Sequence, residues 1–157
     1  MAYTLKEVTI RTNNTQSGIK LISELWQDVN KGKLPIIFDS ENNFQKGISP
    51  ISRYSNYESD ENGDYNLSIL GVDSSFFIKL ENEVKNGKYK KYEFIDDDMI
   101  ESIKNAWKMV WRAQKEGLIN RAYQTDYEST VPAKYTKDNK AHCYLWISVN
   151  WFLVKNI

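Results

Sequence analysis

The chain has one cysteine, one histidine and neither common kind of glycine-rich phosphate loop, and each absence removes a class of function. Because Cys143 is the only cysteine, no disulfide can form within the chain. His142 has no partners at the spacing of a zinc site, and a nucleophilic triad would have to be built on this one histidine. We therefore expect neither a metal nor a cofactor.

The chain also lacks an excess of either charge and any long apolar run. Lysine plus arginine and aspartate plus glutamate both number 21, so the formal net charge is zero, which argues against a general nucleic-acid binder. There is no N-terminal signal region, and no stretch approaches the roughly 20 apolar residues needed to span a bilayer. We expect a cytoplasmic protein without membrane contact, formed by one domain over residues 1–157.

What the chain does have is aromatic residues and a phrase that occurs twice. Aromatic residues make up 13% of the sequence. Asn56-Tyr57-Glu58-Ser59 returns as Asp126-Tyr127-Glu128-Ser129, a displacement of 126 − 56 = 70 residues. Each copy follows an arginine and another tyrosine. The repetition indicates an internal duplication, and the seam of a duplicated domain is a place where small-molecule pockets form.

Periodicity and turn signals give the order of elements. They predict strands at 3–11, 52–59, 65–72, 88–95, 122–130 and 142–153, and helices at 18–31 and from 98 to about 115. Residues 74–83 fit an edge strand or a short helix, and 33–50 form a long connection. The order is β-α-β-β twice, with pseudo-repeats at approximately 3–83 and 88–155. This predicts an α+β fold with one antiparallel sheet, two helices on one face and a ligand groove on the other.

Strand alternation then assigns side chains to the two faces. In the last strand the apolar residues should face the helices: Cys143, Leu145, Ile147 and Val149. The opposite face then carries Tyr144, Trp146, Ser148 and Asn150. We place Glu128 on that opposite face, with Tyr54, Asn56 and Glu58 as the equivalent set in the first half. A carboxylate beside aromatic rings attracts a cation, whereas the plainer alternative pairs Glu128 with Arg121 or a lysine on an exposed sheet.

Several segments in this order carry a family resemblance. They are Tyr54-Ser55-Asn56-Tyr57-Glu58-Ser59, Tyr65-Asn66-Leu67-Ser68-Ile69-Leu70-Gly71, Ala106-Trp107-Lys108-Met109-Val110-Trp111, Asp126-Tyr127-Glu128 and Tyr144-Leu145-Trp146-Ile147-Ser148-Val149. The chain resembles the GyrI-like small-molecule-binding domain, known also as the effector-binding domain of bacterial transcription activators of the AraC and MerR types. The resemblance covers nearly the whole chain and implies a duplicated β-α-β-β unit with a groove at the pseudo-twofold seam.

The resemblance also implies roles for individual residues. Glu128 matches the acidic pocket residue that family members use for lipophilic cations or other drug-like ligands. Tyr144 and Trp146 stand where pocket aromatics are expected, whereas Ser148 stands where the family usually has a proline. The ligand-binding residues expected from the pattern and the resemblance together are Glu128, Tyr144, Trp146, Tyr54, Asn56 and Glu58.

Three functions follow as hypotheses. The first is a stand-alone binding or sequestering protein for an aromatic or lipophilic cation, without a helix-turn-helix module and so without direct DNA binding. The second is a hydrolase of reactive electrophiles, in which Glu128 activates water and Trp146 or Tyr144 positions the substrate, because some stand-alone relatives resemble such hydrolases. The third is a protein-interaction module such as a gyrase inhibitor, which would have a protein partner and rests on family analogy alone.

Overall fold

The computed structural model describes residues 8–31 and 49–150. Its strands are β1 (Val8–Thr12), β2 (Ser49–Ser55), β3 (Tyr65–Val72), β4 (Tyr89–Asp96), β5 (Asp126–Val131) and β6 (Ala141–Ser148). Its helices are α1 (Gln16–Lys31), α2 (Ser74–Lys85) and α3 (Met99–Lys115), with a 3-10 turn η1 at Ala133–Tyr135. Most of the connection expected at 33–50, and the ends of the first and last expected strands, lie outside the described residues. None of the helices in the described ranges is long and apolar enough to cross a membrane.

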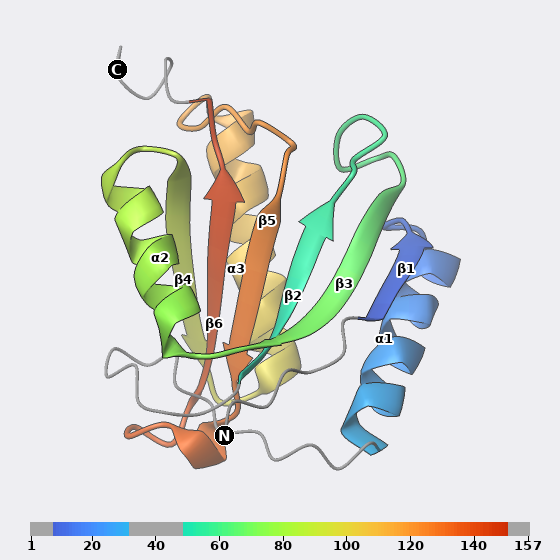
Figure 1. Cartoon of the computed structure of the whole chain (residues 1–157), viewed down its shortest axis with the longest axis vertical. Helices are drawn as coiled ribbons and strands as arrows, with labels where there is room; N and C mark the ends of the chain where they lie inside the picture. The colour runs from blue at the N-terminus through green and yellow to red at the C-terminus, as the bar shows by residue number, and fades with distance from the viewer. Residues whose placement is uncertain (1–7, 32–48, 151–157) are drawn as a thin grey trace.

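The strands form one sheet in the order β1-β3-β2-β5-β6-β4, and every neighbouring pair is antiparallel. The order β-α-β-β occurs twice along the chain, as β1-α1-β2-β3 and as β4-α3-β5-β6, with α2 between the two units. The central strands β2 and β5 come from different units, so the seam between the units runs down the middle of the sheet (Figure 1). The expected α+β fold with an antiparallel sheet is confirmed.

The two faces of the sheet are covered by different helices. On one face, Leu25 of α1 packs with Leu67 of β3, and Val110 of α3 packs with Leu145 of β6. On the other face, Phe77 of α2 packs with Trp146 of β6. Figure 1 shows α2 in front of the sheet and α3 behind it. The expectation of two helices on one face is therefore met by α1 and α3, and α2 is a third helix on the opposite face.

Helix ends follow the local sequence. Asp98 caps α3 by accepting a hydrogen bond from the backbone N–H of Ile100 at 3.2 Å, and Gly117 takes the left-handed conformation just beyond its last turn, with φ of 74°. Both ends were predicted. Residues 74–83, left open between strand and helix, belong to α2, in which Asp73 caps the backbone N–H of Ser75 at 3.0 Å. A side-chain cap of this kind satisfies a helix N-terminus, which an edge strand does not require.

The repeated phrase does not mark equivalent positions in the two units. Strand β3 maps onto β6 with a displacement of 141 − 65 = 76 residues, not 70. The first copy of the phrase lies beyond the end of β2, because Asn56 has a positive φ of 50° and turns the chain out of the strand. The second copy lies inside β5. With the structural displacement, Glu128 corresponds to Ser52 rather than to Glu58, and Ser52 and Glu128 lie directly opposite each other across the seam.

Candidate functional site

Glu128 faces α3, not α2. In the antiparallel register Glu128 lies opposite Leu145, and Tyr127 lies opposite Trp146. Residues directly opposite each other in an antiparallel pair point to the same face. Because Leu145 packs against α3, Glu128 lies between the sheet and that helix. The expectation that Glu128 shares a face with Tyr144 and Trp146 was wrong: Tyr127, the preceding residue of β5, lies on that face instead.

Two hydrogen bonds, one from each unit, hold the Glu128 carboxylate. The indole Nε1–H of Trp107 in α3 donates to Oε1 at 2.7 Å, and the hydroxyl of Tyr54 in β2 donates to the same oxygen at 3.3 Å. Only 6% of the surface of Glu128 is exposed. We call Glu128, Tyr54 and Trp107 the Glu128 site. Tyr54 was predicted as a site residue, whereas Trp107 was assigned to an apolar stripe; its signal was the indole N–H, which needs an acceptor when buried.

Aromatic rings surround this carboxylate and lead outward from it. The ring of Tyr54 lies 5.3 Å from that of Trp107 in an edge-to-face arrangement and 5.6 Å from that of Tyr65. One helical turn further along α3, the ring of Trp111 lies 6.4 Å from that of Trp107, and 43% of Trp111 is exposed. The aromatic surface therefore continues from a buried carboxylate to solvent.

The negative charge of Glu128 has no counter-charge among the described residues. None of the ion pairs in the described ranges includes Glu128. Burial raises the pKa of the Glu128 carboxyl above its ordinary value, and the hydrogen bonds from Trp107 and Tyr54 lower it only in part. Burial outweighs the two hydrogen bonds, and both donors are neutral groups that bring no compensating charge.

Arg121, the cation considered as a partner for Glu128, forms an ion pair with Asp126 instead. Its Nη2 lies 2.9 Å from Oδ2 of Asp126, and its guanidinium lies 4.4 Å from the ring centroid of Tyr123. Asp126 also accepts hydrogen bonds from the Tyr57 hydroxyl at 2.6 Å and from the backbone N–H of Ser148 at 2.7 Å. This buried network fixes Arg121, so the plainer expectation of an Arg121–Glu128 pair was wrong.

Ser52 adds unmet hydrogen-bonding capacity at the seam. Its side chain is buried, and its Oγ has no hydrogen-bond partner among the described residues. It lies opposite Glu128 in the β2–β5 register and so points to the same face. Buried polar atoms are nearly always paired with protein or water, so an unpaired Oγ beside an uncompensated carboxylate is typical of a place that a ligand or water occupies.

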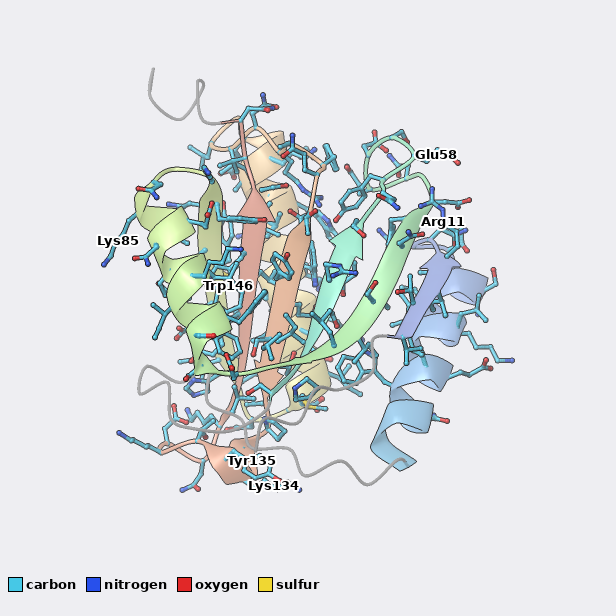
Figure 2. The ribbon with its side chains drawn as sticks, in the orientation of Figure 1. Arg11, Glu58, Lys85, Lys134, Tyr135 and Trp146 are labelled. Carbon is cyan, nitrogen blue, oxygen red and sulfur yellow. The ribbon has the colours of Figure 1, made fainter. Side chains whose placement is uncertain are left out.

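The other expected site residues lie elsewhere. Tyr144 and Trp146 lie under α2 and are buried, with the Trp146 ring 6.0 Å from that of Phe77. Lys91 Nζ lies 5.1 Å from the Tyr144 ring centroid and 5.4 Å from that of Trp146, and it forms an ion pair with Glu81 at 2.6 Å. Asn56 and Glu58 are exposed beyond the end of β2; Figure 2 labels Glu58 in that loop and Trp146 beside α2. The structure thus brings together Glu128 and Tyr54 of the expected set.

Metal-binding chemistry has no candidate cluster in the described ranges. No group of three or more histidine, cysteine, aspartate or glutamate side chains there could hold a metal ion. Cys143 is buried on the α3 face, where burial first and then the nearby Glu128 charge raise the pKa of its thiol. It is therefore a neutral core side chain rather than a nucleophile.

Comparison with known proteins supports the fold. No protein-family model matches the chain, and no curated protein matches it. Among solved structures, the chain is similar to an integron cassette protein from the mobile metagenome of Vibrio cholerae, with a TM-score of 0.58 and 20% sequence identity over 94% of each chain. At this identity the likeness concerns the fold alone.

Proposed function

We propose that this protein binds an aromatic or lipophilic cation at the Glu128 site, as a receptor or sequestering protein. The observation that carries the proposal is a buried carboxylate, 6% exposed, held by two neutral donors and without a cationic partner among the described residues. A buried charge is costly unless it is paired, and a bound cation would supply the missing charge. The surrounding rings of Tyr54 and Trp107 would add cation–π attraction.

Two other places in the same molecule combine a carboxylate with aromatic rings, and each holds a side-chain cation. Asp126 with the Tyr123 ring holds Arg121. Glu81 with the rings of Tyr144 and Trp146 holds Lys91. The Glu128 site has the same chemical composition. Arg121 lies 5.8 Å from the Trp107 ring centroid but pairs with Asp126, and no described side-chain cation forms an ion pair with Glu128. An external cation is the partner that would complete it.

The position of the site also fits the GyrI-like effector-binding domain, which we propose as the family. The site lies where the two β-α-β-β units meet, with Tyr54 from the first unit and both Glu128 and Trp107 from the second. Helices α1 and α3 cover the same face of the sheet on either side of the seam (Figure 1). A ligand that followed the aromatic surface of α3 inward from solvent would meet the exposed Trp111 before Glu128.

Replacing Glu128 with glutamine is expected to weaken the binding of a cationic aromatic probe by about 1–3 kcal/mol, the scale of a hydrogen bond to a charged group. The probe is N,N-dimethylbenzylamine, which is protonated at pH 7, and the measurement is isothermal titration calorimetry. Glu58→Gln is the matched control, because Glu58 belongs to the other copy of the phrase and is exposed in a loop. Equal affinities of the wild type and Glu128→Gln would remove Glu128 as the anchor.

A hydrolase remains as an alternative because the raised pKa of Glu128 suits a general base. Tyr144 and Trp146 would not position its substrate, since they lie on the opposite face of the sheet. Tyr54 and Trp107 would have to take that role. Turnover of an electrophile that disappears in Glu128→Gln, and not in Glu58→Gln, would favour this reaction over simple binding.

A further inference from the structure

Both hydrogen bonds to Glu128 are accepted by one of its two oxygens. Trp107 Nε1–H and the Tyr54 hydroxyl both donate to Oε1. No described residue donates a hydrogen bond to Oε2. A carboxylate oxygen offers about two acceptor sites, so Oε1 is saturated and Oε2 keeps its full capacity.

The two donors also fix which way the carboxylate turns. Trp107 belongs to a helix and Tyr54 to a central strand, and their rings pack edge to face at 5.3 Å, so neither donor moves independently. Rotation of the carboxylate would break at least one of the two bonds. Oε2 is therefore held in a set direction as a charged acceptor that lacks a donor.

A cation without N–H groups would compensate the charge of Glu128 but not this hydrogen-bonding demand. A quaternary ammonium presents methyl groups to Oε2, and an acceptor that a bound ligand cuts off from water without supplying a donor is unfavourable. A protonated tertiary amine carries the same charge on nearly the same shape and has one N–H to donate. Ser52 Oγ, buried and without a partner among the described residues at the opposite position of β2, is a neutral hydroxyl that could accept a second N–H.

We propose that the Glu128 site selects ammonium ligands that carry an N–H group over quaternary ammonium ligands of the same size, with Oε2 as the acceptor that discriminates between them. This inference rests on the proposed function, because it assumes that a cation binds at Glu128. It names the chemical class of the ligand as protonated aromatic amines.

The test compares N,N-dimethylbenzylamine with benzyltrimethylammonium by calorimetry at pH 7, on the wild type and on Glu128→Gln. The two probes differ by one methyl group in place of one hydrogen. The wild type is expected to bind the protonated amine roughly 5- to 150-fold more tightly, the range that corresponds to an acceptor left unpaired in the complex. The extra methyl group of the quaternary probe favours burial of that probe, so apolar area alone gives a preference of the opposite sign.

The glutamine variant controls for shape. Its amide oxygen would accept the hydrogen bonds from Trp107 and Tyr54, which places the amide NH₂ group where Oε2 was. The N–H ligand would then lose its acceptor, and the preference is expected to disappear or reverse.

Each outcome decides the proposal. A preference for the amine that is lost in Glu128→Gln supports it. If the quaternary probe binds as tightly as the amine, and both weaken in Glu128→Gln, the proposed function stands and the N–H selectivity is overturned. If neither probe responds to Glu128→Gln, the proposed function fails, and the inference fails with it.

Discussion

Asp126→Asn is expected to lower the free energy of unfolding by about 3–5 kcal/mol, the range for removing one charge from a buried ion pair. Asp126 and Arg121 are both buried, and their side chains meet at 2.9 Å. The same carboxylate accepts a hydrogen bond from Tyr57 and two from Ser148, from its backbone N–H and its hydroxyl. Removing the charge leaves Arg121 buried without a counter-ion. Equilibrium unfolding in urea at pH 7 measures the change.

A double variant separates the ion pair from the rest of this network. Arg121→Met combined with Asp126→Asn removes both charges, so most of the loss seen in Asp126→Asn is expected to be regained. If Asp126→Asn alone stays within about 0.5 kcal/mol of the wild type, as surface substitutions do, the buried pair is not what holds Arg121. Arg121 would then be available to Glu128, and the account of an uncompensated carboxylate would fail as well.

Phe77→Ala is expected to cost about 3–5 kcal/mol, because it removes a large side chain from a packed core. Phe77 is 0% exposed and packs α2 against Ile51 and Trp146 on the face opposite Glu128. Ile78→Ala is the matched control on the same helix, since Ile78 is 48% exposed, and it is expected to change stability by about 0.5 kcal/mol or less. Thermal or urea unfolding of the two variants gives the comparison.

The same pair of variants tests which face binds the ligand. At a temperature where Phe77→Ala is folded, its affinity for N,N-dimethylbenzylamine is expected to equal that of the wild type, because the Glu128 site lies across the sheet. A binding defect in folded Phe77→Ala would indicate a ligand under α2, next to Tyr144 and Trp146.

The fold could be predicted because its local signals agree with each other. Asp98 as a cap, the apolar stripe that follows it and Gly117 at the end define α3 without any tertiary information. The order β-α-β-β, occurring twice, then allows few arrangements of one antiparallel sheet. Residues 74–83 could not be assigned, because two adjacent phenylalanines suit a strand as well as a helix.

The face of Glu128 could not be read from alternation for a physical reason. Alternation separates an apolar face from a solvated face, and β6 has no solvated face: all of its residues from Ala141 to Ser148 are buried. Helices cover both sides of this strand. The assignment of β6 still held, because Cys143, Leu145 and Ile147 pack against α3 as expected. It failed in β5, where Tyr127 was expected on that face but packs with the α2 cluster. In β5 the acids Asp126 and Glu128 point to α3, where Arg121, Tyr54 and Trp107 supply their partners.

The repeated phrase singled out Glu128 through an equivalence that the structure does not support. It drew attention to Glu128, yet its partner Glu58 lies in an exposed loop, and the position related to Glu128 by the structural displacement is Ser52. A four-residue match cannot detect a six-residue difference in loop length. Both the duplication and its correct register become visible when whole strands are compared.

The pKa of the Glu128 carboxyl, with and without a bound cation, is the most direct test of the central claim. It can be followed by carbon NMR of the side-chain carboxyl and assigned with Glu128→Gln. In the free protein the pKa is expected above the ordinary value for glutamate of about 4.3, because burial disfavours the charged form. Binding of N,N-dimethylbenzylamine is expected to lower it, because the cation favours the carboxylate.

By linkage, affinity for that amine should then rise as pH increases through the free-protein pKa of Glu128. An ordinary pKa that does not move when the amine binds would contradict the account, because Glu128 would then be neither buried without a counter-charge nor in contact with the ligand.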